Sequence, residues 1–146
     1  DRLRARMAEA QPSLVLIGRR HLRSNNSWQH NVTTLAKGKP RCLLQIHPAD
    51  AGARGLTTGM TATIVSSVGS IVAPVEVTDT VMPGVVSLPH GWGHDLAGTR
   101  MTVAAERPGV NVNLLATNEA VDPLSGNPFL NGIPVVVSAA SPQEPR

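Results

Sequence analysis

The sequence predicts a mainly β fold that is closed most economically as a barrel. The chain has 146 residues, a length typical of one domain with a single core. Hydrophobic residues make up 41% of it and aromatic residues only 2%, so the core has to be aliphatic. The 13 glycines and 12 prolines indicate many turns, which suit short strands better than a helical bundle. A barrel is the economical closure for a set of six or seven short strands.

Strands are expected where β-branched and other aliphatic residues cluster between turn signals. They cover residues 13–18, 42–47, 61–67, 71–80, 85–88, 110–115 and 133–138. Residues 48–54 predict a short helix, because proline is favoured in a first helical turn and Gly55 can end the helix. The residues expected in the core are Ile64, Val65, Val75, Val77, Val86 and Val135.

The chain is expected to divide into three parts. Residues 1–12 form a linker or short helix from a preceding domain, residues 13–140 form the barrel, and residues 141–146 form a disordered tail. The absence of an initial Met suggests a piece of something longer. No apolar run approaches the roughly 20 residues of a membrane span, and no secretory signal is recognised. With a single cysteine, Cys42, no internal disulfide is possible, and a cytoplasmic protein is expected.

Charge is distributed unevenly along the chain. Residues 1–55 hold ten Lys or Arg against three acids (10 − 3 = +7), and the remainder holds three against seven (3 − 7 = −4). A basic half can attract nucleic acid, a membrane surface or a phosphorylated small molecule. Plain solvated surface is the alternative, and charge alone leaves the choice open.

Two polar loops carry most of the chemically versatile side chains. Residues 19–31 form a long stretch without periodicity, and such loops are usually functional or disordered. In the second, residues 89–94, His90 and His94 have a spacing that would chelate a metal on a helix. Gly91 and Gly93 disfavour a helix there, so no metal site is expected. Cys42 lies in an apolar strand, where a thiol is inert.

Four segments carry a resemblance to a known family: residues 16–27, residues 47–51 with 55–59, residues 81–92 and residues 109–117. Together they resemble the molydopterin-dinucleotide-binding domain that ends the large subunit of the dimethyl sulfoxide reductase family. That family includes formate dehydrogenases, nitrate reductases and related molybdenum or tungsten oxidoreductases. The resemblance implies a six-stranded double-psi β-barrel with one or two short helices.

The resemblance also implies a function. The chain would bind part of a molybdopterin guanine dinucleotide as the C-terminal domain of an oxidoreductase. Its partners would be the cofactor and the remaining domains of that parent enzyme, with no nucleic acid and no membrane span. The metal, Mo or W, would be held by other domains, so no catalytic or metal-binding residue is expected in this chain. The domain alone is expected to be inactive.

The resemblance assigns the cofactor contacts to both polar loops and to two asparagines. The first loop would wrap the pterin and phosphates with Gly18, Arg19, His21, Leu22, Arg23, Ser24, Asn25 and Ser27. The second would pack on the cofactor with Pro89, His90 and Trp92. Asn113 falls in an Asn-x-Leu-Thr-like motif, and its amide both donates and accepts hydrogen bonds. Asn131 stands where many relatives have a lysine, so that contact departs from the family pattern.

Less specific interpretations stay open for these residues. The arginines of the first loop can simply face water, as expected above all for Arg20; Trp92 can fill the core, and Asn113 can serve a turn. An alternative function is a free-standing double-psi barrel that binds a protein or nucleic acid through its basic N-terminal half. The chain lacks the interleaved aromatic residues that stack on bases, which counts against nucleic acid.

Overall fold

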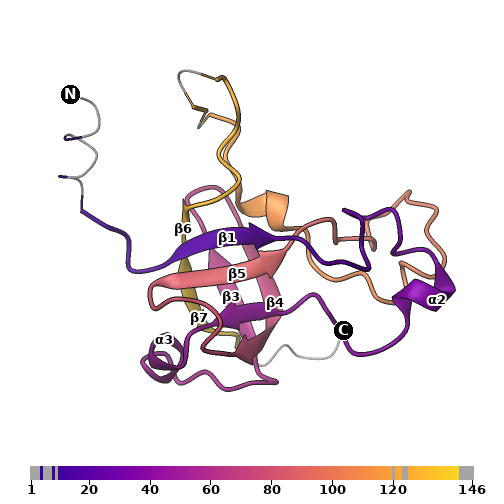
Figure 1. Cartoon of the computed structure of the whole chain (residues 1–146), viewed down its shortest axis with the longest axis horizontal. Helices are drawn as coiled ribbons and strands as arrows, with labels where there is room; N and C mark the ends of the chain where they lie inside the picture. The colour runs from indigo at the N-terminus through magenta and orange to yellow at the C-terminus, as the bar shows by residue number, and fades with distance from the viewer. Residues whose placement is uncertain (1–3, 5–7, 9, 120, 123–124, 142–146) are drawn as a thin grey trace.

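The structure is a computed structural model that describes residues 4, 8, 10–119, 121–122 and 125–141. Within these residues seven strands form one sheet in the order β6-β1-β5-β2-β4-β3-β7 (Figure 1). The strands are β1 (Val15–Arg19), β2 (Leu44–Ile46), β3 (Thr61–Val65), β4 (Ser70–Val77), β5 (Val85–Pro89), β6 (Ile133–Pro134) and β7 (Val136–Ala139). The helices are α2 (Thr33–Ala36), α3 (Pro48–Gly52) and the one-turn 3-10 helix η1 (Val112–Leu115).

The last strands close the sheet on itself. β6 pairs antiparallel with β1, and β7 pairs antiparallel with β3, at the opposite end of the strand order. Only Val135 separates β6 from β7, so one continuous segment joins both edges of the sheet. The predicted mainly β barrel is therefore confirmed. It has seven strands instead of six because the strand expected at 133–138 is divided between these two pairings.

Crossed connections produce two parallel pairs inside this otherwise antiparallel sheet. β1 pairs with β5, and β2 pairs with β4, so each pair requires a crossover connection. Helix α3 lies in the connection from β2 to β3, where Pro48 occupies the first turn and the His47 side chain accepts a hydrogen bond from the Ala49 N–H. Asp50 of α3 accepts a hydrogen bond of 2.7 Å from the Gly84 N–H, which fixes the turn before β5. The short helix predicted from Pro48 is thus confirmed.

The barrel interior is aliphatic, as the composition predicts. Its fully buried side chains include Leu14, Leu16, Leu44, Ile46 and Leu88. Four of the expected core residues are buried, namely Ile64, Val75, Val86 and Val135, and Val77 is half-buried against the core. The expectation for Val65 is wrong. Successive side chains of a strand face opposite sides, so Val65 points outward beside the inward Ile64 and is 40% exposed.

Two other local expectations differ from the structure. Residues 110–115 predict a strand, but the Asn111 side chain accepts a hydrogen bond from the Asn113 N–H and begins η1 instead. Helix α2 was not expected, because residues 19–31 and their continuation show no periodicity. The segments 1–12 and 141–146 fall largely outside the described residues, and so do the expectations placed on them.

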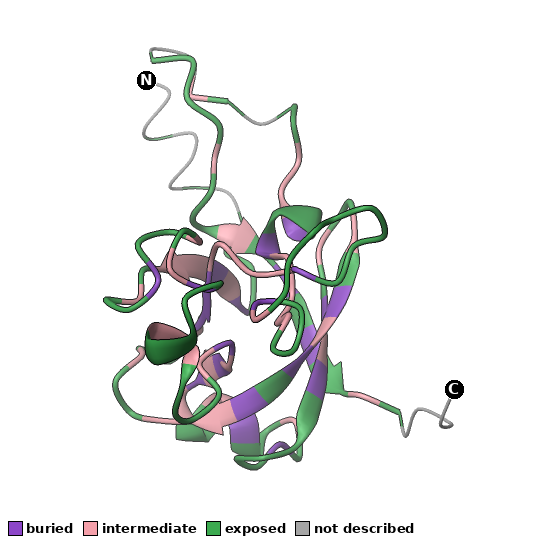
Figure 2. Ribbon diagram, turned by 90° about the vertical axis from the view of Figure 1, so that its right-hand side faces the viewer, coloured by how far each residue is buried: buried purple, intermediate pink, exposed green. Residues whose placement is uncertain are grey.

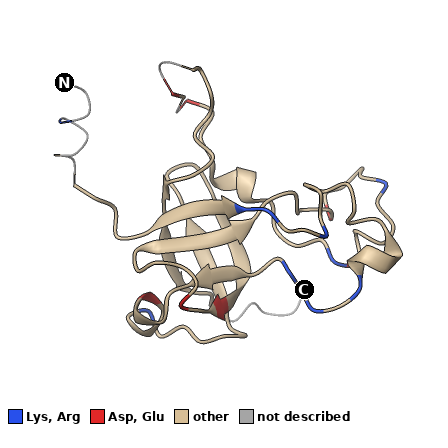
Figure 3. Ribbon diagram, viewed as in Figure 1, with Lys and Arg blue, Asp and Glu red and all other residues tan. Residues whose placement is uncertain are grey.

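Two long connections lie together at one end of the barrel. Residues 20–43, with α2, and residues 90–111 project from the ends of β1 and β5 on the right of Figure 1. Asn31 joins them, because its side-chain oxygen accepts hydrogen bonds from the N–H groups of Thr102 and Ala104. Buried residues concentrate in the barrel strands, while these loops are mostly exposed or half-buried (Figure 2). Arginines and lysines follow the first loop (Figure 3). A rigid barrel that carries long polar loops is typical of a binding domain.

Candidate functional site

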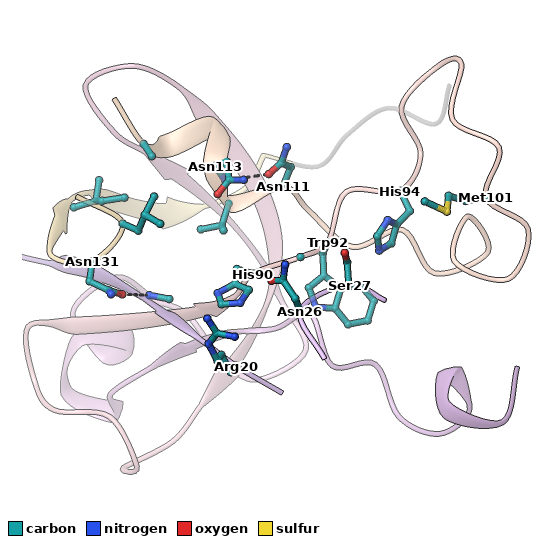
Figure 4. Close-up of a pocket in the computed structure, with 16 residues that line it drawn as sticks. Arg20, Asn26, Ser27, His90, Trp92, His94, Met101, Asn111, Asn113 and Asn131 are labelled. Carbon is teal, nitrogen blue, oxygen red and sulfur yellow. Dashed lines mark hydrogen bonds between the residues drawn. The ribbon is translucent and has the colours of Figure 1, made fainter. Parts of the chain in front are cut away.

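A hollow of about 650 Å³ lies where the parallel strands β1 and β5 end (Figure 4). Arg19 and Pro89 are register partners at these ends, so the residues after them are brought side by side. The start of η1 and the segment before β6 complete the walls. The polar residues around the hollow are Arg20, Asn26, Ser27, His90, Trp92, His94, Asn111, Asn113 and Asn131. Of the described residues, the lining includes one guanidinium and no carboxylate.

A close approach of two loop backbones builds one wall. Gly91 has a φ of +83°, and a Cβ placed on it would lie 2.5 Å from the backbone oxygen of Asn26. Asn25 and Asn26 have φ values of 41° and 64°, a left-handed conformation that asparagine tolerates better than most residues. The glycine is therefore required both by its backbone angle and by the neighbouring chain. This contact places Asn26 and Ser27 beside Trp92 at the rim of the hollow.

Another wall of the hollow is positioned by the side-chain amide of Asn131. The Asn131 side-chain oxygen accepts a hydrogen bond of 2.7 Å from the Gly18 N–H, which ties the segment before β6 to β1. Asn111 caps η1, and Asn113 is exposed on the hollow two residues later. These side chains present amide donors and acceptors around an open space, a set that suits polar heterocycles.

Behind the Trp92 wall lies a buried pair of histidines. His30 is only 4% exposed, and its Nδ1 lies 2.8 Å from Nε2 of His94. The ring of His30 also packs on Trp92 with a centroid distance of 3.9 Å. One of the two nitrogens has to donate and the other to accept, so the pair fixes both rings. His30 thus holds His94 and Trp92 in place at the hollow.

Burial keeps these histidines neutral. It is the main cause that lowers the pKa of His30 to about 4, with the charges of His94 and Arg41 acting in the same direction. Burial also lowers the pKa of His94, and the nearby Asp95 carboxylate partly opposes that shift.

We predict that His30 makes the stability of the domain depend on pH. The folded pKa of about 4 lies below the ordinary 6.5, so the unfolded chain binds more protons and the contribution is fully present above pH 6.5. It is lost as the pH falls from about 6.5 toward 4, by at most about 3 kcal/mol at 1.36 kcal/mol per pKa unit. Urea unfolding at several pH values checks this. The variant His30→Asn should show a shallower dependence, and equal slopes in the two proteins would contradict the prediction.

The structure brings six of the thirteen predicted site residues together at the hollow: Gly18, Ser27, His90, Trp92, Asn113 and Asn131. The other seven, Arg19, His21, Leu22, Arg23, Ser24, Asn25 and Pro89, do not line it. Leu22 is 96% exposed, whereas Ser24 and Pro89 are buried. Cofactor contact by these seven remains a prediction, now without support from the shape of the site.

Arg19 does not line the hollow. Its guanidinium donates hydrogen bonds to the backbone oxygens of Ser87, at 2.7 Å, and Leu43, at 2.9 Å. It therefore joins β5 to the segment before β2. Burial lowers the pKa of this guanidinium.

The sequence reasoning missed four polar lining residues: Arg20, Asn26, His94 and Asn111. Arg20 is exposed, as expected, but it faces the hollow. Arg20 directly follows β1, so strand alternation does not predict its direction. The sequence singled out His94 only for its spacing to His90, and its position at the hollow depends on the distant His30.

The described residues contain no group of three or more His, Cys, Asp or Glu able to hold a metal ion. His94 is instead hydrogen-bonded to His30. Cys42 is buried, and that burial raises the pKa of its thiol, which agrees with the inert thiol expected from its strand. No described helix has the length and apolar character needed to cross a bilayer.

Fold and site together define a class of protein: a β-barrel whose loops border a polar, cation-bearing hollow. A comparison with protein families shows the family of the chain. Residues 14–134 match the family described as the molydopterin dinucleotide binding domain, and the chain belongs to that family. Its cofactor is accordingly molybdopterin guanine dinucleotide. Every polar residue that lines the hollow falls within the matched range.

The chain is similar to segments of much larger proteins. It is 31% identical over 116 residues to a tetrathionate reductase subunit of Salmonella typhimurium, covering 68% of this chain and 11% of that protein. It is 33% identical over 82 residues to the dimethyl sulfoxide/trimethylamine N-oxide reductase of Rhodobacter capsulatus, covering 56% and 10%. The fold is similar to that of acetylene hydratase from Pelobacter acetylenicus, with a TM-score of 0.72, 22% identity, and coverage of 88% of this chain and 18% of that one. The chain thus spans about a tenth of the length of its curated relatives.

Proposed function

We propose that the chain is the C-terminal domain of a molybdenum- or tungsten-dependent oxidoreductase, such as a formate dehydrogenase or a nitrate reductase-like enzyme. In this proposal the hollow at the ends of β1 and β5 holds part of the molybdopterin guanine dinucleotide. The observation that carries it is that polar residues from four separate segments, all inside the family match, converge on one hollow.

The donor set around the hollow fits this cofactor. Arg20 supplies a planar, permanently charged fork, which suits a pyrophosphate. Four asparagine side chains supply the paired donors and acceptors that a pterin or guanine edge requires: Asn26, Asn111, Asn113 and Asn131. No carboxylate in the lining would repel phosphate. The volume of about 650 Å³ lies within the usual range of small-molecule sites.

The domain contributes binding and orientation to the parent enzyme. The bound cofactor supplies the electron-transfer chemistry. Arg20 neutralises phosphate charge, the asparagines orient the heterocycle, and Trp92, held by His30, excludes water from one side. The hollow is open, so in this proposal the remaining domains of the parent cover the other side of the cofactor.

Guanosine diphosphate tests the site in the chain itself. We expect weak, millimolar binding to the isotopically labelled chain, because in this proposal other domains of the parent supply the rest of the pocket. Amide resonances of Arg20, Asn26 and Asn113 should shift together, while those of α3, which Asp50 ties to the turn before β5, should not. Shifts confined to the exposed loop around Arg23, with none at the hollow, would contradict the proposed site.

The isolated 146-residue chain should show no turnover of formate, nitrate or sulfoxides with an artificial electron carrier. The described residues offer no cluster that could hold the metal, and the chain corresponds to about a tenth of its curated relatives. Activity assays on the purified chain with added molybdate or tungstate check this expectation. Metal-dependent turnover would overturn it.

A further inference from the structure

A second hollow, of about 480 Å³, lies against Trp92 and shares only that residue with the first. Ala36 and the residues 38–42 and 107–110 form most of it, together with Pro74. Its walls are largely apolar and include Pro40, Pro74, Pro108 and Val110. The chemistry of this hollow therefore differs from that of the amide-rich site where Arg20 lies.

Among the residues that the structure describes, three cations and no carboxylate line the second hollow: Lys39, Arg41 and Arg107. None of these cations takes part in the ion pair between Asp50 and Arg54. The charges of Arg23 and Arg107, after burial as the main cause, lower the pKa of the Arg41 guanidinium. The cations thus repel one another without a neutralising partner among the described residues.

The backbone holds the two arginines but leaves one donor unused. Arg107 Nη1 donates to the backbone oxygens of Ala36 and Gly38, and Arg41 Nη2 donates to that of Leu35. Arg41 Nη1 is buried and has no hydrogen-bond partner among the described residues. Buried donors are rarely left unpaired, because a buried N–H without an acceptor has given up its hydrogen bonds to water and gained none. The described residues therefore leave the hydrogen-bonding capacity of Nη1 unmet, on a side chain that lines the second hollow.

We propose that this second hollow is a separate binding site for a carboxylate attached to an apolar body. The carboxylate pairs with Arg41 Nη1, with Lys39 and Arg107 adding positive charge, and the apolar body lies against the prolines and Trp92. The acid comes either from an acidic side chain of another domain of the parent or from a free organic acid. The site does not depend on where the dinucleotide binds.

Phenylacetate is a suitable probe, with the neutral phenylacetamide as its control. We expect saturable shifts of the Trp92 indole N–H and of the Gly38 and Val110 amides when phenylacetate is added to the labelled chain. Phenylacetamide should bind at least about tenfold more weakly, since it lacks the charge that strengthens hydrogen bonds to guanidinium. Shifts that do not saturate, or equal binding of both probes, would overturn the proposal.

Single-residue variants test which cations of the second hollow bind the carboxylate. Arg41→Gln should weaken phenylacetate binding by roughly tenfold or more, and Lys39→Ala by a few-fold. Lys37→Ala is the matched control, because Lys37 is exposed two residues away and does not line the hollow. If Arg41→Gln fails to fold, the comparison of Lys39→Ala with Lys37→Ala carries the test. Unchanged affinity in Lys39→Ala and in any folded Arg41→Gln protein would refute the site.

The complete parent enzyme separates the two sources of the acid. If a side chain of another domain fills the site, phenylacetate binds the isolated chain but not this site in the parent. If the ligand is a free organic acid, phenylacetate binds both proteins. Either result supports the carboxylate site. If phenylacetate binds neither the isolated chain nor the parent, the proposal is contradicted.

Discussion

Arg20→Ala in the complete parent enzyme should lower cofactor affinity by about tenfold to a hundredfold. Arg20 is the cation that lines the hollow, and a charge-assisted hydrogen bond contributes about 1.5–3 kcal/mol. At about 1.4 kcal/mol per decade, its loss corresponds to this range of affinity. Metal and pterin content after extended dialysis measures the effect.

Arg23→Ala is the matched control for Arg20→Ala. Arg23 is an exposed arginine of the same loop, but it does not line the hollow. We expect its removal to leave cofactor content close to that of the unaltered enzyme. The sequence alone predicts the reverse ranking, with Arg23 as the contact and Arg20 in solvent. Greater loss in Arg23→Ala than in Arg20→Ala would support that reverse ranking and contradict the site described above.

Gly91→Ala should destabilise the domain by about 2–6 kcal/mol and distort the hollow. The substitution adds the backbone cost of a left-handed non-glycine residue, about 1–3 kcal/mol, to overpacking of about 1–3 kcal/mol. The overpacking arises because the new Cβ meets the backbone oxygen of Asn26 at 2.5 Å. Urea unfolding of the chain measures the loss of stability, and guanosine diphosphate binding should weaken in parallel.

Gly98→Ala isolates the backbone part of that effect. Gly98 has a similar φ of +87°, but a Cβ there would meet nothing within 4 Å. Its substitution should cost only the backbone term and leave the hollow intact. If the two substitutions lowered the free energy of unfolding equally, the close approach of Gly91 to Asn26 would contribute nothing to the effect of Gly91→Ala.

Much of the barrel was predictable from local patterns. Aliphatic runs between turn signals located the strands, and Pro48 with Gly55 located α3. Val65 shows the limit of such patterns, because a β-branched residue at a strand end can face either side and only the register decides. The split of residues 133–138 depends on pairing with both β1 and β3, which no local window contains. The η1 turn was missed because an asparagine side chain redirected an apolar segment.

The residues around the hollow were predictable only in part. Both polar loops assigned to the cofactor by the resemblance contribute to the hollow, and six of the thirteen predicted residues line it, while cofactor contact itself stays a prediction. Direction could not be read from the sequence: Arg19, Arg20 and Arg23 are chemically alike, and only the geometry of the chain at and after the end of β1 separates them. The His30–His94 contact joins residues 64 positions apart, so spacing along the chain gave no indication of it.

A structure of the complete parent enzyme with its cofactor tests the central claim most directly. The claim is that the dinucleotide lies in the hollow where β1 and β5 end. We predict that part of the dinucleotide fills the space between Asn26, His90 and Asn113, with a phosphate oxygen within hydrogen-bonding distance of Arg20. A dinucleotide held wholly outside that hollow, with Arg20 turned to solvent, would contradict the account.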